Sequence, residues 1–433
     1  MKDFLQQKLV PFVLKIVNFK SIQAIKNGMF YVMPLTIVGS IFLLLANFPW
    51  APVVNLLASL GMIAPFNQIA GATFDIIALV AVVGIAYEYC KAENLGGALH
   101  CGIIALASFL ILQDSFVITD AGLQISGVLD KGWLGGKGVI VAILVGLLAG
   151  KVYTFFLKRD IRIKLPAGVP EGIANSFSGL IPALATFVIA AAVYGIFKGI
   201  WNITFVEAIY KVIQIPLQGM TDSLGGAIVM PFAITLLWFF GVHGSSIVSG
   251  IMQPVLMANT LDNQAILDRG LELTVANGGH VVTQQFLDQF ITVTGSGMTI
   301  GLVLFLVIFA KSRQNKTLGD LSVVPALFNI NEPILFGVPI VLNPLMAVPF
   351  ILTPVISAVV TYFALYVGLV PLFSAVMVPW TTPPIISGFI VGGWKTALLQ
   401  LIVLSMSFFI YLPFIRSIDK HNLAVEKAAE SQQ

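Results

Sequence analysis

A single carboxylate stands out in the apolar second half of this 433-residue sequence, within FNINEPILFGVPIVLNP (residues 328–344). Glu332 is the only Asp, Glu, Lys or Arg within residues 321–394. A carboxylate in the interior of a membrane costs several kcal/mol and normally faces a partner or a water-filled cavity. We therefore expect Glu332 and its neighbour Asn331 to line a substrate pocket. The alternative is a solvated loop, which the short distance along the chain from Lys316 permits.

The residues that follow Glu332 predict a broken helix. Pro333, Gly337, Pro339 and Pro344 each interrupt or weaken helical structure. Irregular backbone at membrane depth survives only where protein covers it or where it lines a cavity. Broken helices mark the binding sites of many transporters, so the pattern indicates a binding site.

A second candidate lies in LLWFFGVHGSSIVSG, residues 236–250. A histidine inside a helix bundle is often only hydrogen-bonded to its neighbours, and His243 alone would be weak support for a site. Gly241 and Gly244 flank it and allow a ligand to approach the backbone. Trp238, nearby in sequence, adds an aromatic surface, and together these residues favour a ligand site.

Two further stretches contribute candidates. In VPWTTPPIISGF, residues 378–389, Trp380 is either an aromatic platform beside threonine hydroxyls or an ordinary tryptophan of the membrane interface, and the sequence does not separate the two. In LPAGVPEGIANSFSGLIPAL, residues 165–184, Asn175 is an unusual residue for a membrane helix. The remaining histidines, His100, His280 and His421, are interpreted as packing, loop and tail residues.

This inventory favours a sugar as the ligand. Carboxylate, amide, imidazole and hydroxyl groups bind sugar hydroxyls, and an indole ring covers a C–H face. The sequence contains no GxxxxGK[ST] phosphate loop, so it is not an ATPase subunit with its own nucleotide site. The two cysteines, Cys90 and Cys101, form no CxxC pair or metal cluster. We expect no metal and no cofactor.

The elements that position these residues must lie in a membrane. The chain is 58% hydrophobic and only 10% charged, with a mean hydropathy of +0.96, whereas a soluble protein carries about a quarter charged residues. Windows of roughly twenty apolar residues fit membrane-spanning helices and not barrel strands. The net charge of +3 implies no nucleic-acid surface. The expected class is an all-α polytopic membrane protein.

We predict about ten transmembrane helices, with amphipathic surface helices and re-entrant hairpins. The clear apolar spans lie at about 28–47, 72–90, 97–114, 138–157, 177–200, 226–242, 297–310, 345–366 and 395–415. Lys/Arg clusters at both ends, at 158–164 and at 311–316 place these parts in the cytoplasm. For all these clusters to lie on the same side of the membrane, the chain must cross it once more within 243–296. The prolines of 367–393 favour a re-entrant segment there.

The expected organisation has five parts. Residues 1–27 form an amphipathic surface helix, 28–200 an N-terminal transmembrane half, 201–225 an amphipathic connector, 226–415 a C-terminal half with the site, and 416–433 a cytoplasmic tail.

Four motifs in this order, VPEGIANSF, WFFGVHG, NEPILFG and PWTTPPIISG, resemble the membrane (enzyme IIC) component of the phosphoenolpyruvate-dependent sugar phosphotransferase system. The similarity is to its lactose/cellobiose/diacetylchitobiose branch and covers essentially the whole chain. It implies a homodimer in the bacterial cytoplasmic membrane, with the N-terminal spans at the interface. It also implies a sugar site in the C-terminal half and transfer of a phosphoryl group to the sugar 6-hydroxyl.

The resemblance also assigns roles. The phosphoryl donor is a phosphocysteine on a separate IIB protein, supplied by IIA, because neither tail has room for a fused carrier domain. Glu332 and His243 would hold the sugar near its 6-hydroxyl, and either could be the base. The other site residues would be Asn175, Trp238, Asn331 and Trp380. The substrate would be a β-linked disaccharide such as cellobiose.

A proton-coupled secondary transporter with Glu332 as the proton carrier is the alternative function. The intramembrane carboxylate alone supports it equally well. No inverted repeat is detectable in the sequence, which mildly disfavours it.

Overall fold

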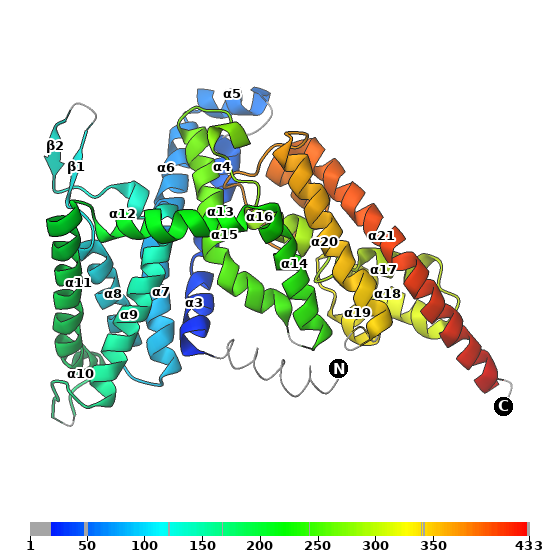
Figure 1. Ribbon diagram of the computed structural model, residues 1–433, viewed down its shortest axis with the longest axis horizontal. Helices are drawn as coiled ribbons and strands as arrows, with labels where there is room; N and C mark the ends of the chain where they lie inside the picture. Colours follow the sequence, from blue (N-terminus) through cyan, green and yellow to red (C-terminus); the bar gives the residue numbers. More distant parts are fainter. Residues whose placement is uncertain are drawn as a thin grey trace. The chain divides into compact units, whose positions relative to one another are not determined.

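The computed structural model describes residues 19–46, 51–119, 122–166, 168–241, 243–338, 340 and 343–430, most of them helical (Figure 1). Six of the described helical segments are long and apolar enough to cross a membrane. The number is seven if the bent pair Phe205–Thr221 and Leu224–Phe239 forms one broken span. The protein is therefore a mostly α-helical integral membrane protein; the expected all-α class is modified by one short β-hairpin. Residues 1–18 of the expected surface helix at 1–27 lie outside the described set.

The described chain divides into two compact units. The N-terminal unit contains residues 19–219 and 250–261, and the C-terminal unit contains residues 220–249 and 262–430.

The N-terminal unit is a helix bundle with one small hairpin. Its helices are α3 (Lys20–Phe30), α4 (Met33–Ala46), α5 (Ala51–Ser59), α6 (Ile63–Phe74), α7 (Ile77–Ala92), α8 (Ala98–Ile111), α9 (Val139–Lys158), α10 (Glu171–Ser178), α11 (Leu180–Trp201) and α12 (Phe205–Ile209). Helix α12 continues through a π-helical turn, Tyr210–Gln214, into α13 (Ile215–Thr221), whose last two residues belong to the C-terminal unit. Strands β1 (Phe116–Ile118) and β2 (Gln124–Ser126) pair antiparallel, with Val117 opposite Ile125.

Helix α7 is the centre of this bundle and packs against α3, α8 and α9. Glycines bring the backbones together, as is common between membrane helices. A Cβ atom on Gly28 of α3 would lie only 2.5 Å from the backbone nitrogen of Ile85, and one on Gly84 would lie 2.7 Å from the carbonyl oxygen of Gly28. A side chain at either position would therefore force α3 away from α7.

The C-terminal unit is built from helices broken by irregular segments. They are α14 (Leu224–Phe239), α15 (Gly244–Asp268, of which 250–261 belong to the N-terminal unit), α16 (Gln284–Phe286) with the π-helical turn Leu287–Ile291, α17 (Ile300–Ile308), α18 (Arg313–Leu327), α19 (Glu332–Gly337), α20 (Pro344–Tyr366) and α21 (Ile386–Glu430). Residues 368–385 contain no helix, as their prolines predict. Helix α21 is kinked at Gly392 and Gly393.

Two elements differ from the expected spans. Within the predicted span 297–310, only Ile300–Ile308 is α-helical, and nine residues of helix extend only about 14 Å, too short to cross a bilayer. Helix α15 fills much of the unassigned region 243–296 and has 25 residues, about 37 Å at 1.5 Å per residue. Hydropathy does not mark α15 because it carries polar side chains, including the buried Asn259 and Asn263.

Candidate functional site

His243 is positioned by the junction between α14 and α15. The helix α14 ends at Phe239, and Gly241 adopts a φ of +78°. His243 then caps α15: its Nδ1 accepts a hydrogen bond from the backbone N–H of Ser246 at 3.2 Å and lies 2.9 Å from Ser246 Oγ. Glycine is required at 244, where a Cβ atom would lie 2.0 Å from the carbonyl oxygen of Ile234.

Trp238 packs directly on this histidine. The two ring centroids are 4.5 Å apart, and the Phe336 ring of α19 is 6.5 Å from Trp238. Trp238 is 6% exposed, and its indole N–H has no hydrogen-bond partner among the described residues. An unpaired buried donor costs about 1–3 kcal/mol. Such a group can be satisfied by a ligand that displaces the surrounding side chains.

A glycine-rich turn at residues 294–299 connects His243 to Asn331. Ser296 Oγ lies 2.5 Å from Ser245 Oγ, next to the histidine. Asn331 Nδ2 donates to the Ser296 carbonyl at 2.7 Å and to Thr299 Oγ1 at 3.1 Å. Because these bonds use the amide N–H groups of Asn331, this side chain fixes the turn at 294–299 to the segment that contains Asn331.

Glu332 follows Asn331 and begins the short helix α19. Its carboxylate is half-buried and has no hydrogen bond or ion pair with any residue that the structure describes. A carboxylate in the first turn of a helix interacts favourably with the helix dipole. The acceptor oxygens of Glu332 therefore stay available to a ligand.

Asn329 links this segment to the Trp380 region. It adopts a left-handed φ of +64°. Its Oδ1 accepts from the backbone N–H of Thr294 at 2.6 Å, and its Nδ2 donates to the carbonyls of Trp380 and Thr382 at 2.5 and 2.9 Å. The indole of Trp380 is 51% exposed. Asn329 therefore holds three segments of the C-terminal unit together.

Hydrogen bonds and a ring contact thus connect the segments that carry five of the six expected site residues. These residues are Trp238, His243, Asn331, Glu332 and Trp380. Asn175 belongs to the N-terminal unit, where its amide oxygen is 3.0 Å from the position of a Cβ atom on Gly96. Sequence analysis assigned no role to Ser245, Ser296, Thr299 or Asn329, although TGSGMT and FNIN are unusually polar for their surroundings.

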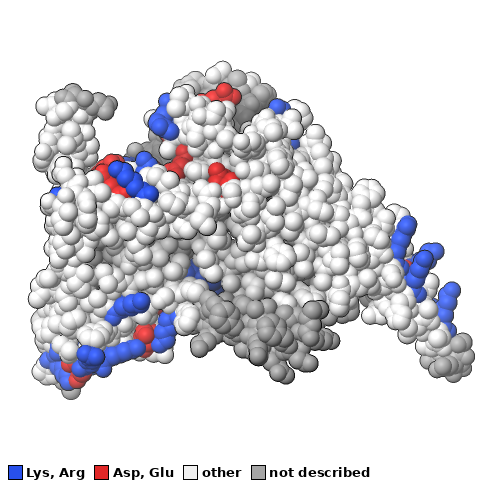
Figure 2. Space-filling model, in the orientation of Figure 1, with Lys and Arg blue, Asp and Glu red and all other residues white. Residues whose placement is uncertain are grey.

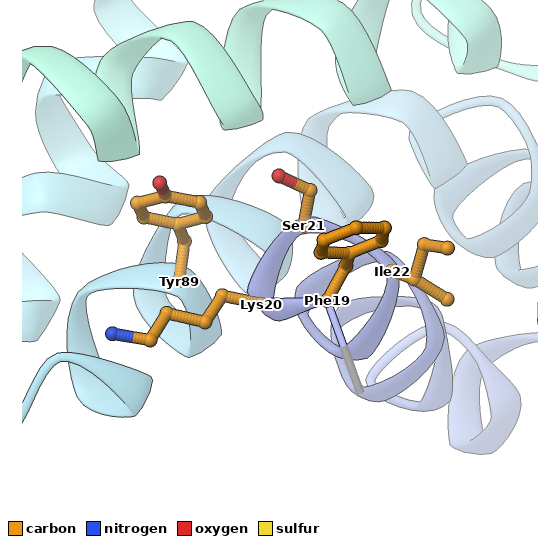
Figure 3. A pocket seen from close by; sticks show the side chains of 5 residues that line it. All are labelled: Phe19, Lys20, Ser21, Ile22 and Tyr89. Atoms are coloured by element: carbon orange, nitrogen blue, oxygen red, sulfur yellow. The ribbon is translucent and has the colours of Figure 1, made fainter. Parts of the chain in front are cut away.

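A different hollow, of about 540 Å³, opens at the start of α3 in the N-terminal unit (Figure 3). Its lining residues are Phe19, Lys20, Ser21, Ile22 and Tyr89. Lys158 and Lys20 both form ion pairs with Glu93 and hold the pKa of that carboxyl below its usual range. Because these lining residues carry no carboxylate or amide side chain, the hollow does not match the expected sugar site.

His280 is more than a loop residue. It lies between α15 and α16, is 20% exposed, and places Nδ1 3.1 Å from Asp222 and Nε2 3.7 Å from Asp262. Burial lowers the pKa of His280, but the hydrogen bonds to Asp222 and Asp262 outweigh it and raise the pKa to about 9. His280 is therefore a cation at neutral pH and joins the start of α14 to α15.

This ion pair predicts a pH-dependent stability. Because the pKa of His280 is raised on folding, its stabilisation is complete below pH 6.5 and is lost as the pH rises through about 9. The size is on the order of 3 kcal/mol. We expect Tm to fall between pH 6.5 and 9, and His280→Gln to flatten this part of the profile. An equal fall in the variant would assign the pH dependence to other groups.

The fold defines a class: a helical membrane protein in which polar side chains gather where helices are broken, a feature of transporters. The family description "Phosphotransferase system, EIIC" matches residues 26–354. The oligo-beta-mannoside-specific EIIC component of Bacillus subtilis is 35% identical, with 100% of this chain and 97% of that protein covered. The cellobiose-specific EIIC component of Geobacillus stearothermophilus is 37% identical, with coverages of 98% and 95%.

The crystal structure of the transporter ChbC, the IIC component of the N,N'-diacetylchitobiose-specific phosphotransferase system, superimposes with a TM-score of 0.93. It is 34% identical and the match covers 98% of this chain and 99% of that one. The chain belongs to the EIIC family, the membrane components of the sugar phosphotransferase system, which work with IIB and IIA partners.

Proposed function

We propose that this protein binds a cellobiose-like β-linked disaccharide, carries it across the bacterial cytoplasmic membrane and presents its 6-hydroxyl to a phosphorylated IIB protein. The main support is the chain of contacts that leads from Glu332 to His243. Glu332, which has no partner among the described residues, follows Asn331, and Asn331 bonds to Ser296. Ser296 in turn contacts Ser245, two residues after His243, and the His243 ring packs on Trp238. The full-length similarity to components named for cellobiose and oligo-beta-mannoside supports β-linked substrates. Asn175 is included in the site on the family resemblance alone.

The hydrogen bonds of His243 favour a division of labour with Glu332. Since Nδ1 accepts from the Ser246 N–H, the neutral imidazole carries its proton on Nε2 and can only donate from there. Glu332 offers free acceptor oxygens, so we assign it as the base that takes the 6-hydroxyl proton. The sugar oxygen then bonds to phosphorus as the P–S bond of phosphocysteine breaks, leaving a cysteine thiolate on IIB. His243 donates a hydrogen bond to the reacting oxygens, a role of positioning and charge stabilisation.

Uptake into membrane vesicles tests this function. With IIA, IIB and the general phosphotransferase proteins inside, we expect uptake of cellobiose to require phosphoenolpyruvate and to yield sugar phosphate in the lumen. Accumulation of unmodified sugar that an uncoupler abolishes would instead establish proton-coupled transport. The full-length match to phosphotransferase components does not favour that alternative.

The complete topology is also a proposal: about ten crossings, with both termini in the cytoplasm. The long polar helix α15 is a suitable candidate for the crossing that hydropathy does not mark. The short α17 and the non-helical residues 368–385 suit re-entrant segments, because irregular backbone in a membrane must be covered by protein. The halves at 28–200 and 226–415, joined by the connector 201–225, follow from this topology.

The cytoplasmic assignment of the 158–164 loop can be tested by labelling. We expect a membrane-impermeant maleimide to leave Arg162→Cys unmodified in intact cells and to modify it once the cells are opened. Cys90 and Cys101 are both buried and serve as the internal background. Efficient labelling in intact cells would place this loop outside the cell and would show that the predicted number of crossings before it is wrong.

A homodimer through the N-terminal half completes the proposal. The hairpin β1–β2 exposes Ile118 and Leu123, at 62% and 68%. Because an open sheet edge is not stable in the hydrocarbon, these side chains lie outside it, where a second copy of the chain can cover them. The molecular mass of the purified protein in detergent distinguishes a dimer from a monomer.

A further inference from the structure

The start of α18 and the end of α21 form one structure in the C-terminal unit, which we call the clasp (residues 311–316 and 416–430). Asp419 and Glu426, both on α21, accept hydrogen bonds from backbone N–H groups that open α18. The donors, at 2.9–3.1 Å, are Lys311, Ser312, Arg313 and Gln314. Asn315 Nδ2 adds a further bond to Asp419 at 3.0 Å.

These bonds commit the two carboxylates to the backbone and leave the clasp rich in cations. Six exposed side chains carry positive charge: Lys311, Arg313, Lys316, Arg416, Lys420 and Lys427. Only Arg313 has a carboxylate partner in the described part of the chain, Glu430 at 3.6 Å. Figure 2 shows Lys and Arg side chains gathered where α21 ends.

Several basic residues of the N-terminal unit have a carboxylate partner. Lys20 and Lys158 share Glu93, while Arg162 and Lys164 share Asp160. Each of these two carboxylates offsets one of its two cations. In the clasp, five cations have no carboxylate partner among the described residues, and they lie on two segments that its hydrogen bonds hold together.

The length of α21 favours a soluble partner over lipid headgroups. After its kink, residues 394–430 extend for roughly 55 Å, whereas a bilayer with headgroups is about 40–45 Å thick. A tilt of about 20° shortens the projection only slightly. Even if the helix starts at the far edge of the hydrocarbon, Lys420 and Lys427 lie at or beyond the headgroups.

We infer that the clasp is the docking surface for the phosphorylated IIB protein. This inference rests on the proposed function. The phosphocysteine adds about two negative charges to its carrier, and a surface of unpaired cations attracts such a protein and speeds its association. Docking here is also close to the chemistry, because α18 runs from the clasp to Leu327, five residues before Glu332, and is only about 22 Å long. A standard interface covers about 800 Å² on each partner, a patch roughly 30 Å across, which is wider than α18 is long.

Binding of IIB to the full-length protein in nanodiscs tests the inference. The probes are IIB phosphorylated on its cysteine and the same protein with serine at that position. We expect Lys420→Glu with Lys427→Glu to weaken binding of phosphorylated IIB by about tenfold or more at low ionic strength, and less at high salt. Both residues are exposed on a helix, so the fold and the sugar affinity should not change. Lys420→Arg with Lys427→Arg is the matched control and should bind as the wild type does.

Unchanged IIB affinity in the charge-reversed protein, or no binding of IIB by the wild type, would overturn the inference. So would a variant that keeps its IIB affinity but loses affinity for vesicles containing phosphatidylglycerol, since the clasp would then be a lipid site. Failure of the proposed function looks different. In that case wild-type protein binds IIB through the clasp, but no phosphoryl group reaches a sugar.

Discussion

Replacing Glu332 by glutamine lowers the affinity for a β-linked disaccharide by about ten- to a hundredfold. The substitution keeps the shape of the side chain and one acceptor oxygen but removes the charge. A hydrogen bond to a charged group contributes roughly 1.5–3 kcal/mol, and Glu332 has no competing partner among the described residues. Tryptophan fluorescence or calorimetry on the purified protein measures the loss. Phosphorylation falls further than binding, because glutamine cannot take the hydroxyl proton.

Glu332→Ala should lose at least as much affinity, since a sugar hydroxyl then remains unpaired. The variant also loses a favourable charge at the start of α19, a small effect of about 0.3–1 kcal/mol. Its Tm and oligomeric mass should stay close to the wild type. Wild-type sugar affinity in a correctly folded Glu332→Ala protein would return Glu332 to the role of a solvated loop residue.

Much of the candidate site could be proposed from the sequence, because its polar residues are concentrated in short motifs. Glu332 is indicated because it is a single carboxylate near helix-breaking residues, and His243 because glycines flank it. Neither indication requires any knowledge of the fold. The turn at 294–299 could not be identified in this way. Its role comes from long-range hydrogen bonds, from Asn331 to Ser296 and from Asn329 to Thr294. Sequence spacing gives no information on such contacts.

The fold, like the candidate site, could be predicted only in part from the sequence. Apolar windows predict the long apolar helices, such as α9 and α20. They do not mark α15, because a helix whose polar side chains are satisfied inside the protein need not be apolar. Asn263, for example, donates from Nδ2 to the carbonyls of His280 and Phe373 at 2.9 and 2.8 Å. Hydropathy also predicts a longer helix than α17. Gly295, Gly297 and Met298 are small or apolar, but they adopt positive φ angles, so the helix begins only after them.

His243→Asn separates binding from phosphoryl transfer. Asparagine is a good N-cap residue, so it can keep the hydrogen bond to the Ser246 N–H while removing the imidazole. We expect disaccharide affinity to change by less than about threefold. We expect the rate of phosphorylation at saturating sugar and IIB to fall by about a hundredfold or more, as when one donor to a developing negative charge is lost. Single-turnover transfer from phosphorylated IIB, measured beside sugar binding, gives both quantities.

His243→Ala and Ser246→Ala complete this test. The alanine at 243 also removes the helix cap, which costs about 0.5–2 kcal/mol, so its Tm should fall while that of His243→Asn should not. Ser246→Ala removes the hydroxyl 2.9 Å from Nδ1 but leaves the backbone N–H that orients the ring, and its transfer rate should stay close to the wild type. If His243→Asn transfers phosphate at the wild-type rate, the imidazole does not act on the 6-hydroxyl. His243 would then be a capping residue that supports Trp238, and the stabilisation of the transfer step would have to come from Glu332 and from IIB.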